Sequence, residues 1–118
     1  MTTLITRAEL RAAIAEGSVS VVDALPEQHY AQAHLPGAIN LVEQDVAARA
    51  ATLLPDRAAA IVTYCSNVSC ANSQAVASLL EQRGYTNVRK YRGGIQDWSE
   101  AGLPTESGLP AGSGAVAG

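Results

Sequence analysis

Short runs of β-branched residues alternate with segments of helical character along this chain of 118 residues. Hydrophobic spacing predicts helices between Thr6 and Gly17 and over 26–33, 43–54 and 73–83, with a short one after Gly93-Gly94. Strands are predicted over 18–24, 38–41, 59–64 and 88–91, and the pair Leu4-Ile5 forms a further short apolar segment. Strands that alternate with helices form a parallel sheet covered on both faces. The pattern therefore predicts an α/β fold with a parallel sheet flanked by helices.

The ends of two predicted helices carry specific signals. Thr6 and Glu9 have the spacing of a capping box, in which the threonine side chain and the glutamate side chain each satisfy a backbone N–H of the other residue. Gly17 and Gly84 follow the last apolar residues of their helices and predict helix termination.

The composition is that of one globular domain, with 47% hydrophobic and 16% charged residues. Residues 1–106 are predicted to form this domain. After Thr105 the chain consists mainly of glycine, alanine, serine and proline, so 107–118 is predicted to be a flexible C-terminal tail.

Charge and hydropathy narrow the expected partners and location. The net charge is −3 and no large cluster of lysine and arginine offsets it, which argues against nucleic acid or an acidic membrane surface as the main partner. No segment approaches the roughly 18 apolar residues of a membrane helix, and the N-terminus lacks an apolar signal core. We therefore expect a cytoplasmic protein with no membrane association.

The two cysteines, Cys65 and Cys70, lie in one short loop. Cys65 follows the predicted strand 59–64, and ligands of open α/β sheets bind beyond the carboxyl ends of the strands. The loop continues with mostly small residues, Ser66, Asn67, Val68, Ser69, Cys70 and Ala71. Such a loop can point its backbone N–H groups inward and bind an anion, and the helix after it adds about +0.5 of a charge at its N-terminus.

Two interpretations of Cys65 follow from this position. A free thiol has a pKa of about 8.5, and a helix N-terminus can lower that value to about 3.5–7.5, so Cys65 could be a nucleophilic thiolate at neutral pH without a histidine or lysine partner. Alternatively, Cys65 is a small residue of the core.

Several segments of the chain resemble the rhodanese homology domain. Val21-Val22-Asp23-Ala24 followed by His34-Leu35-Pro36-Gly37-Ala38-Ile39-Asn40 is similar to the first signature of that family, and Tyr64-Cys65 is similar to the start of its active loop. Three later segments are similar to the C-terminal part of the family's pattern. They are Gly84-Tyr85-Thr86-Asn87-Val88, Gly93-Gly94-Ile95-Gln96-Asp97-Trp98 and Ala101-Gly102-Leu103-Pro104. The resemblance covers roughly residues 4–106.

The resemblance implies a sheet of about five parallel strands and a sulfurtransferase mechanism. The Cys65 thiolate would take the outer sulfur of thiosulfate or a persulfide and hold it as Cys–S–S⁻ within the loop Ser66–Ala71. It would then pass the sulfur to a thiol acceptor, either a small molecule or a protein. This is two-step nucleophilic catalysis that requires no cofactor. The two histidines have no third ligand nearby, and no metal site is predicted.

The loop departs from the family at two positions. Many sulfurtransferases of the family have an arginine where this chain has Cys70, and an arginine two residues after the strand aspartate, where this chain has Leu25. Arginine offers a fork of donors to an oxyanion. Its loss predicts weaker binding of thiosulfate, which is a dianion.

Three supporting residues have more than one interpretation. Cys70 is either a buried, inert replacement for arginine, which we favour, or a thiol that resolves Cys65 by forming a disulfide, or a further sulfur carrier. A disulfide requires the two Cα atoms to lie within about 7 Å. Asp23 is expected to support the site through backbone N–H groups rather than by catalysis. Arg92 either replaces part of the missing positive charge or is solvated.

Two functions are therefore compared. The first is a sulfurtransferase or sulfur carrier that forms a persulfide on Cys65. The alternative is a non-catalytic rhodanese module that binds a partner or senses thiol oxidation. Phosphate-ester or arsenate chemistry is disfavoured, because related phosphatases have a longer loop and require its arginine.

Overall fold

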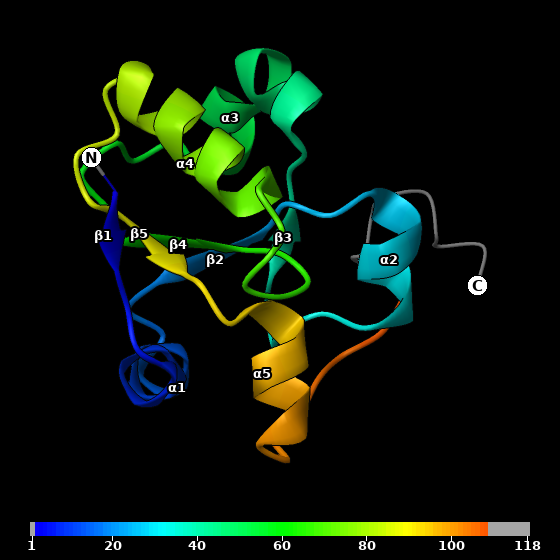
Figure 1. Cartoon of the computed structure of the whole chain (residues 1–118). Coiled ribbons are helices and arrows are strands. Elements are labelled where there is room, and N and C mark those ends of the chain that lie inside the picture. Colours follow the sequence, from blue (N-terminus) through cyan, green and yellow to red (C-terminus); the bar gives the residue numbers. More distant parts are fainter. Residues whose placement is uncertain (1, 109–118) are drawn as a thin grey trace.

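The structure is a computed structural model that describes residues 2–108. Five strands form one sheet in the order β1-β5-β4-β2-β3, and every neighbouring pair is parallel (Figure 1). The strands are β1 (Thr3–Leu4), β2 (Ser20–Asp23), β3 (Ile39–Asn40), β4 (Ile61–Tyr64) and β5 (Val88–Tyr91). The predicted parallel α/β sheet is confirmed, and β4 lies at its centre.

Helices cover both faces of this sheet. Helices α3 (Val46–Leu53) and α4 (Asn72–Gln82) lie on one face, and α1 (Arg7–Glu16) and α5 (Gly94–Glu100) lie on the other (Figure 1). The short helix α2 (Glu27–Gln32) lies beyond the β3 edge. Within residues 2–108, no helix has the length and apolar character needed to cross a membrane.

The helix-end signals in the sequence are confirmed. Thr6 and Glu9 form the predicted capping box at the start of α1, and Gly17 ends this helix with a φ of 69°. The left-handed backbone region is open to glycine without the steric cost that other residues incur. Gly84, after α4, has a φ of 93°.

Two segments differ from the prediction. The helix expected over 43–54 begins with a separate 3₁₀ turn, η1 (Glu43–Asp45), because no side chain caps the first turn of this segment and the chain tightens there instead. Leu4, expected only as part of a short apolar segment, belongs to the edge strand β1, which pairs with β5 through Thr3–Arg89 and Leu4–Lys90. Two residues are too few to show the alternation that reveals a strand.

The alternation of side chains along β4 divides the core into two layers. Ile61 and Cys65 pack with Val76 and Leu80 of α4, whereas Val62 and Tyr64 pack on the other face, together with Leu10 of α1 and Trp98 of α5. Because successive side chains of a strand point to opposite faces, the side chain of Cys65 is directed to the α3/α4 face.

The C-terminal end of the described chain is held against α2. The N–H of Gly108 donates to the Ala31 carbonyl at 2.7 Å, and His34 and Glu106 exchange two backbone hydrogen bonds of 2.8 Å. The part of the predicted tail from 109 to 118 lies outside the described residues, and its flexibility stays a prediction.

A buried hydrogen-bond network joins the carboxyl ends of β2 and β4. The Tyr64 hydroxyl donates to Asp23 Oδ2 at 2.7 Å and accepts from the Leu35 N–H at 3.0 Å. Asp23 Oδ1 accepts from the Leu25 N–H at 2.8 Å. Asp23 is fully buried, and this burial raises the pKa of its carboxyl group, while the bonds from Tyr64 and Leu25 oppose the rise.

Tyr64→Phe should destabilise the fold by about 1–3 kcal/mol at neutral pH, because it leaves a buried carboxylate oxygen and the Leu35 N–H without partners. Since the lost bond stabilises the ionised carboxyl group, the deficit should shrink at acidic pH, where Asp23 is protonated. Urea unfolding of both proteins at neutral and acidic pH measures this difference. A deficit that does not depend on pH would contradict the role given to this bond.

Candidate functional site

Cys65 is the first residue after the central strand β4, as predicted, and only 2% of its surface is exposed. The loop from Ser66 to Ala71 connects it to α4 and lies beside the first turn of α5 (Figure 1). Because β4 and β5 are parallel neighbours, the chain leaves both strands at the same edge of the sheet. The site is therefore enclosed by the starts of α4 and α5.

The start of α5 holds the first two residues of the loop through backbone hydrogen bonds. The N–H groups of Ile95 and Gln96 donate to the carbonyls of Cys65 and Ser66, both at 2.9 Å. Gly94 permits this approach, because its φ is +67° and a Cβ atom there would lie 2.7 Å from the Ser66 carbonyl carbon. Gly94 thus positions Cys65 without contributing a side chain.

The start of α4 is held in place by polar contacts with the sheet. Thr63 Oγ1 on β4 donates to the Ser73 carbonyl at 3.0 Å, and Asn72 Nδ2 donates to the Ala24 carbonyl at 3.3 Å. Among the described residues no side chain caps α4, and its first turn holds no acidic residue. The positive end of the helix dipole is therefore left uncompensated beside the Cys65 loop.

Ser73 is a site residue that the sequence analysis missed. Its hydroxyl lies 3.5 Å from Cys65 Sγ, and the residue is 2% exposed. A hydroxyl in this position can donate to a thiolate or to a persulfide sulfur. Its position in the first turn of the helix after the cysteine was the available signal.

The loop forms a local turn around Asn67. The Ser69 N–H donates to Asn67 Oδ1 at 2.9 Å and the Cys70 N–H donates to the Asn67 carbonyl at 3.1 Å. Two of the six backbone N–H groups expected to surround an anion are therefore engaged within the loop. Among residues 2–108, no acceptor is found for the N–H groups of Ser66, Asn67, Val68 and Ala71.

Cys70 is paired with Cys65 in a disulfide, and the two Cα atoms are 6.3 Å apart. The side chain of Cys70 is half-buried and packs against the core layer that contains Cys65. The interpretation favoured in the sequence analysis, a buried and inert Cys70, does not agree with this disulfide. Its position satisfies the distance condition for the resolving interpretation.

The structure brings neither of the two other supporting candidates into contact with the loop. Asp23 accepts a backbone N–H, as expected, but from Leu25 rather than from a residue of the loop. It supports the site indirectly, through Tyr64. Arg92 is exposed, and in the described part of the chain it makes no ion pair or hydrogen bond to the loop.

A hollow of about 460 Å³ adjoins the start of α4 and reaches Asn72 and Ala24. Its charged lining comprises Glu27, Glu43, Asp45 and Arg49. The acidic side chains outnumber the single cation, so the charge beside the start of α4 disfavours a dianion.

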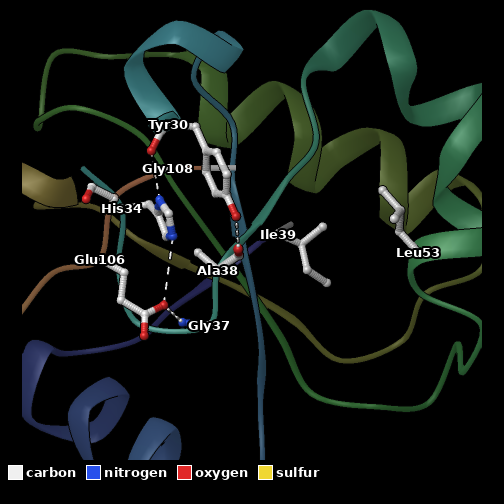
Figure 2. A pocket seen from close by; sticks show the side chains of 9 residues that line it. Tyr30, His34, Gly37, Ala38, Ile39, Leu53, Glu106 and Gly108 are labelled. Carbon is white, nitrogen blue, oxygen red and sulfur yellow. Dashed lines mark hydrogen bonds and ion pairs between the residues drawn. The ribbon is translucent and has the colours of Figure 1, made fainter. Parts of the chain in front are cut away.

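A second hollow, of about 580 Å³, lies away from Cys65 between α2, β3 and the C-terminal segment (Figure 2). His34 stacks on Tyr30 and bonds its carbonyl through Nδ1 at 2.7 Å. Glu106 Oε1 accepts the Gly37 N–H at 2.8 Å and lies 3.8 Å from His34 Nε2 (Figure 2). These contacts hold the turn and the C-terminal segment together, and we assign them a structural role.

Residues 6–101 match the pattern of the family described as "Rhodanese-like domain". The chain belongs to this family. The predicted resemblance is therefore confirmed over most of the chain. Among solved structures, the BH2092 protein of Bacillus halodurans has the same fold, with a TM-score of 0.81 and 25% identity over 97% of this chain and 83% of that one.

Two curated relatives have names that indicate different functions. An HTH-type transcriptional regulator of Mycobacterium tuberculosis is 37% identical over 93% of this chain and 47% of its own length. The thiosulfate sulfurtransferase PspE of Escherichia coli is 40% identical over 62% of this chain and 66% of its own length. The rhodanese-like chain thus spans about half of the regulator's length and about two thirds of the sulfurtransferase's length.

Gly94→Ala should lower the rate at which Cys65 reacts with a small thiol-specific alkylating reagent or takes up sulfur, by between roughly tenfold and a hundredfold, because the new Cβ displaces the Cys65 and Ser66 carbonyls. Stopped-flow or mass-spectrometric rates on the reduced protein measure the effect. Gly102→Ala is the matched control, since Gly102 has a φ of +76° and open space around it, so its variant carries only the backbone strain. Equal rates in the two variants would contradict the positioning role of Gly94.

Proposed function

We propose that this rhodanese-like domain is a sulfurtransferase or sulfur carrier that forms a persulfide on Cys65. The observation that carries the proposal is the position of Cys65, which lies at the end of β4 with its Sγ atom 3.5 Å from the Ser73 hydroxyl, next to the uncapped start of α4. Backbone N–H groups and a helix N-terminus stabilise a sulfur anion without a charged side chain.

The first step begins from the reduced pair of cysteines. The Cys65 thiolate attacks the outer sulfur of the donor, an S–S bond of the donor breaks, and the leaving group departs as sulfite from thiosulfate or as a thiolate from a persulfide. The sulfur remains on Cys65 as Cys–S–S⁻. The N–H groups of Ser66, Asn67, Val68 and Ala71, which have no acceptor within residues 2–108, are the groups available to hold its negative charge.

The second step returns the cysteine to its thiolate form. An acceptor thiolate, from a small molecule or a protein, attacks the outer sulfur of the persulfide and leaves with it, and Cys65 is the leaving group. The two steps exchange one sulfur atom by covalent catalysis and use no metal or organic cofactor.

A persulfide fits this site better than thiosulfate as the sulfur donor. The loop holds Cys70 where many family members have arginine, and within residues 2–108 Arg92 makes no hydrogen bond or ion pair to the loop. The hollow beside the start of α4 has more acidic than basic side chains in its lining. A dianion therefore meets little compensating charge. The name of the PspE relative supports sulfur transfer as the reaction class, and thiosulfate remains the donor to compare.

Cys65→Ser should abolish sulfur loading while leaving the fold intact, because serine fills nearly the same space beside Ser73. Intact-protein mass spectrometry of reduced Cys70→Ser, in which no second cysteine can discharge the sulfur, detects the added sulfur after incubation with thiosulfate, and separately with glutathione persulfide. A reducing agent should remove this sulfur, and the double variant Cys65→Ser/Cys70→Ser should gain none. Loading that survives in Cys65→Ser would overturn the assignment of the nucleophile.

Cys70→Arg should raise kcat/KM for thiosulfate relative to Cys70→Ser, because both variants lack the disulfide but only the first adds a cation. A charge-assisted hydrogen bond contributes about 1.5–3 kcal/mol, so the gain should be about tenfold to a hundredfold. Turnover with cyanide as the acceptor measures it, and activity with a persulfide donor should change less. Equal thiosulfate turnover in two folded variants would show that the missing cation is not the limitation.

A second candidate function is thiol redox sensing, which the Cys65–Cys70 disulfide favours. The name of the mycobacterial relative, a transcriptional regulator, is compatible with such a role. In this case oxidation would close the disulfide, but neither donor would load sulfur on reduced Cys65. The loading experiment above therefore separates the two candidates.

A further inference from the structure

We propose that Cys70 is an internal acceptor that discharges the Cys65 persulfide and releases its sulfur as hydrosulfide. The inference rests on the proposed function, because it begins from a loaded Cys65. It adds an activity to that function, in which the sulfane sulfur of a persulfide is reduced by the protein's own dithiol. A dithiol reductant then restores the starting state.

The disulfide shows that the two sulfur atoms meet within the folded loop. The Cα atoms of Cys65 and Cys70 are 6.3 Å apart, which lies inside the range that a disulfide spans without movement of the backbone. The Asn67 turn fixes this separation, because its carbonyl accepts the Cys70 N–H at 3.1 Å and its side chain accepts the Ser69 N–H at 2.9 Å. The Cys70 sulfur is thus held next to Cys65 by hydrogen bonds within the loop.

Burial favours Cys70 over an external acceptor. Cys65 is 2% exposed, and Cys70 packs against the same core layer and is bonded to Cys65 through its sulfur. An external thiol has to reach a buried sulfur, whereas Cys70 needs no encounter with a second molecule. A group held in reacting geometry has a high effective concentration.

The reaction balances without a further oxidant. The Cys70 thiolate attacks Cys65 Sγ, the bond between Sγ and the outer sulfur breaks, and the outer sulfur leaves with the electron pair of that bond as HS⁻, taking the proton that Cys70 lost. The outer sulfur is reduced, and the two cysteines are oxidised to the disulfide. The contact of the two Sγ atoms favours attack on the inner sulfur over transfer of the outer one.

The exposure of the two cysteines also defines the return step. Cys70 is the more accessible of the two, so a dithiol attacks its sulfur and Cys65 leaves as the thiolate. The uncapped start of α4 and the Ser73 hydroxyl stabilise this leaving group. The second thiol of the reductant then releases Cys70 as a thiol, and the reductant leaves as a disulfide.

A single-turnover experiment tests the proposal. Wild type and Cys70→Ser are fully reduced, separated from the reductant without exposure to air, and mixed with glutathione persulfide in slight excess. Hydrosulfide is trapped with a bimane reagent, and the protein is analysed by intact mass spectrometry. Cys65→Ser and wild type without donor are the controls for background hydrosulfide and for oxidation by air.

We expect wild type to release one equivalent of hydrosulfide and to lose two hydrogen atoms as its disulfide forms, whereas Cys70→Ser gains one sulfur atom and releases no hydrosulfide above the Cys65→Ser background. A wild type that keeps the added sulfur, or a Cys70→Ser protein that releases hydrosulfide as fast as wild type, would overturn the role of Cys70 but leave the proposed function intact. Failure of Cys70→Ser to load sulfur would instead overturn the proposed function, and the inference with it.

Discussion

The close approach of α5 to the Cys65 loop is the contact on which the geometry of the site depends. It requires a residue without a side chain and with a positive φ at position 94, and it gives the Cys65 and Ser66 carbonyls two backbone donors. The parallel pairing of β4 with β5 makes the contact possible, because both chains leave the sheet at one edge. With these carbonyls bound to α5, the remaining residues of the loop lead into the start of α4.

Within residues 2–108, neither the Asp23 nor the Arg92 side chain makes a hydrogen bond or ion pair to the Cys65 loop. The buried carboxylate of Asp23 binds Tyr64 and Leu25, so its charge is balanced by hydrogen bonds at the end of β2 and not by the loop. Arg92 is exposed. A sulfur anion on Cys65 consequently depends on backbone N–H groups, the Ser73 hydroxyl and the α4 dipole, which suit a small anion of low charge better than a sulfate-like group.

Local patterns in the sequence predicted the fold and the position of Cys65 at the end of a strand, because they act over a few residues. The capping box at Thr6, the glycine after α1 and the buried strand that leads into Cys65 are all of this kind. The contact of Ser73 with Cys65 and the approach of Gly94 depend on how separate elements pack, and a single sequence does not encode these distances locally. The pairing of Cys70 was one of three open interpretations for the same reason, since it depends on the curvature of the loop around Asn67.

A cysteine at position 70 supplies different chemistry from the arginine that the family resemblance led us to expect there. An arginine offers positive charge and holds an oxyanion, whereas a thiol offers an electron pair and can form a bond with the sulfur next to it. Because the length of the loop is kept, the position still reaches Cys65, and the disulfide is the natural end of a turnover that lacks a reductant. If Cys70 discharges Cys65 as proposed, a domain that closes its disulfide as it consumes sulfane sulfur would also change its own covalent state in proportion to its substrate.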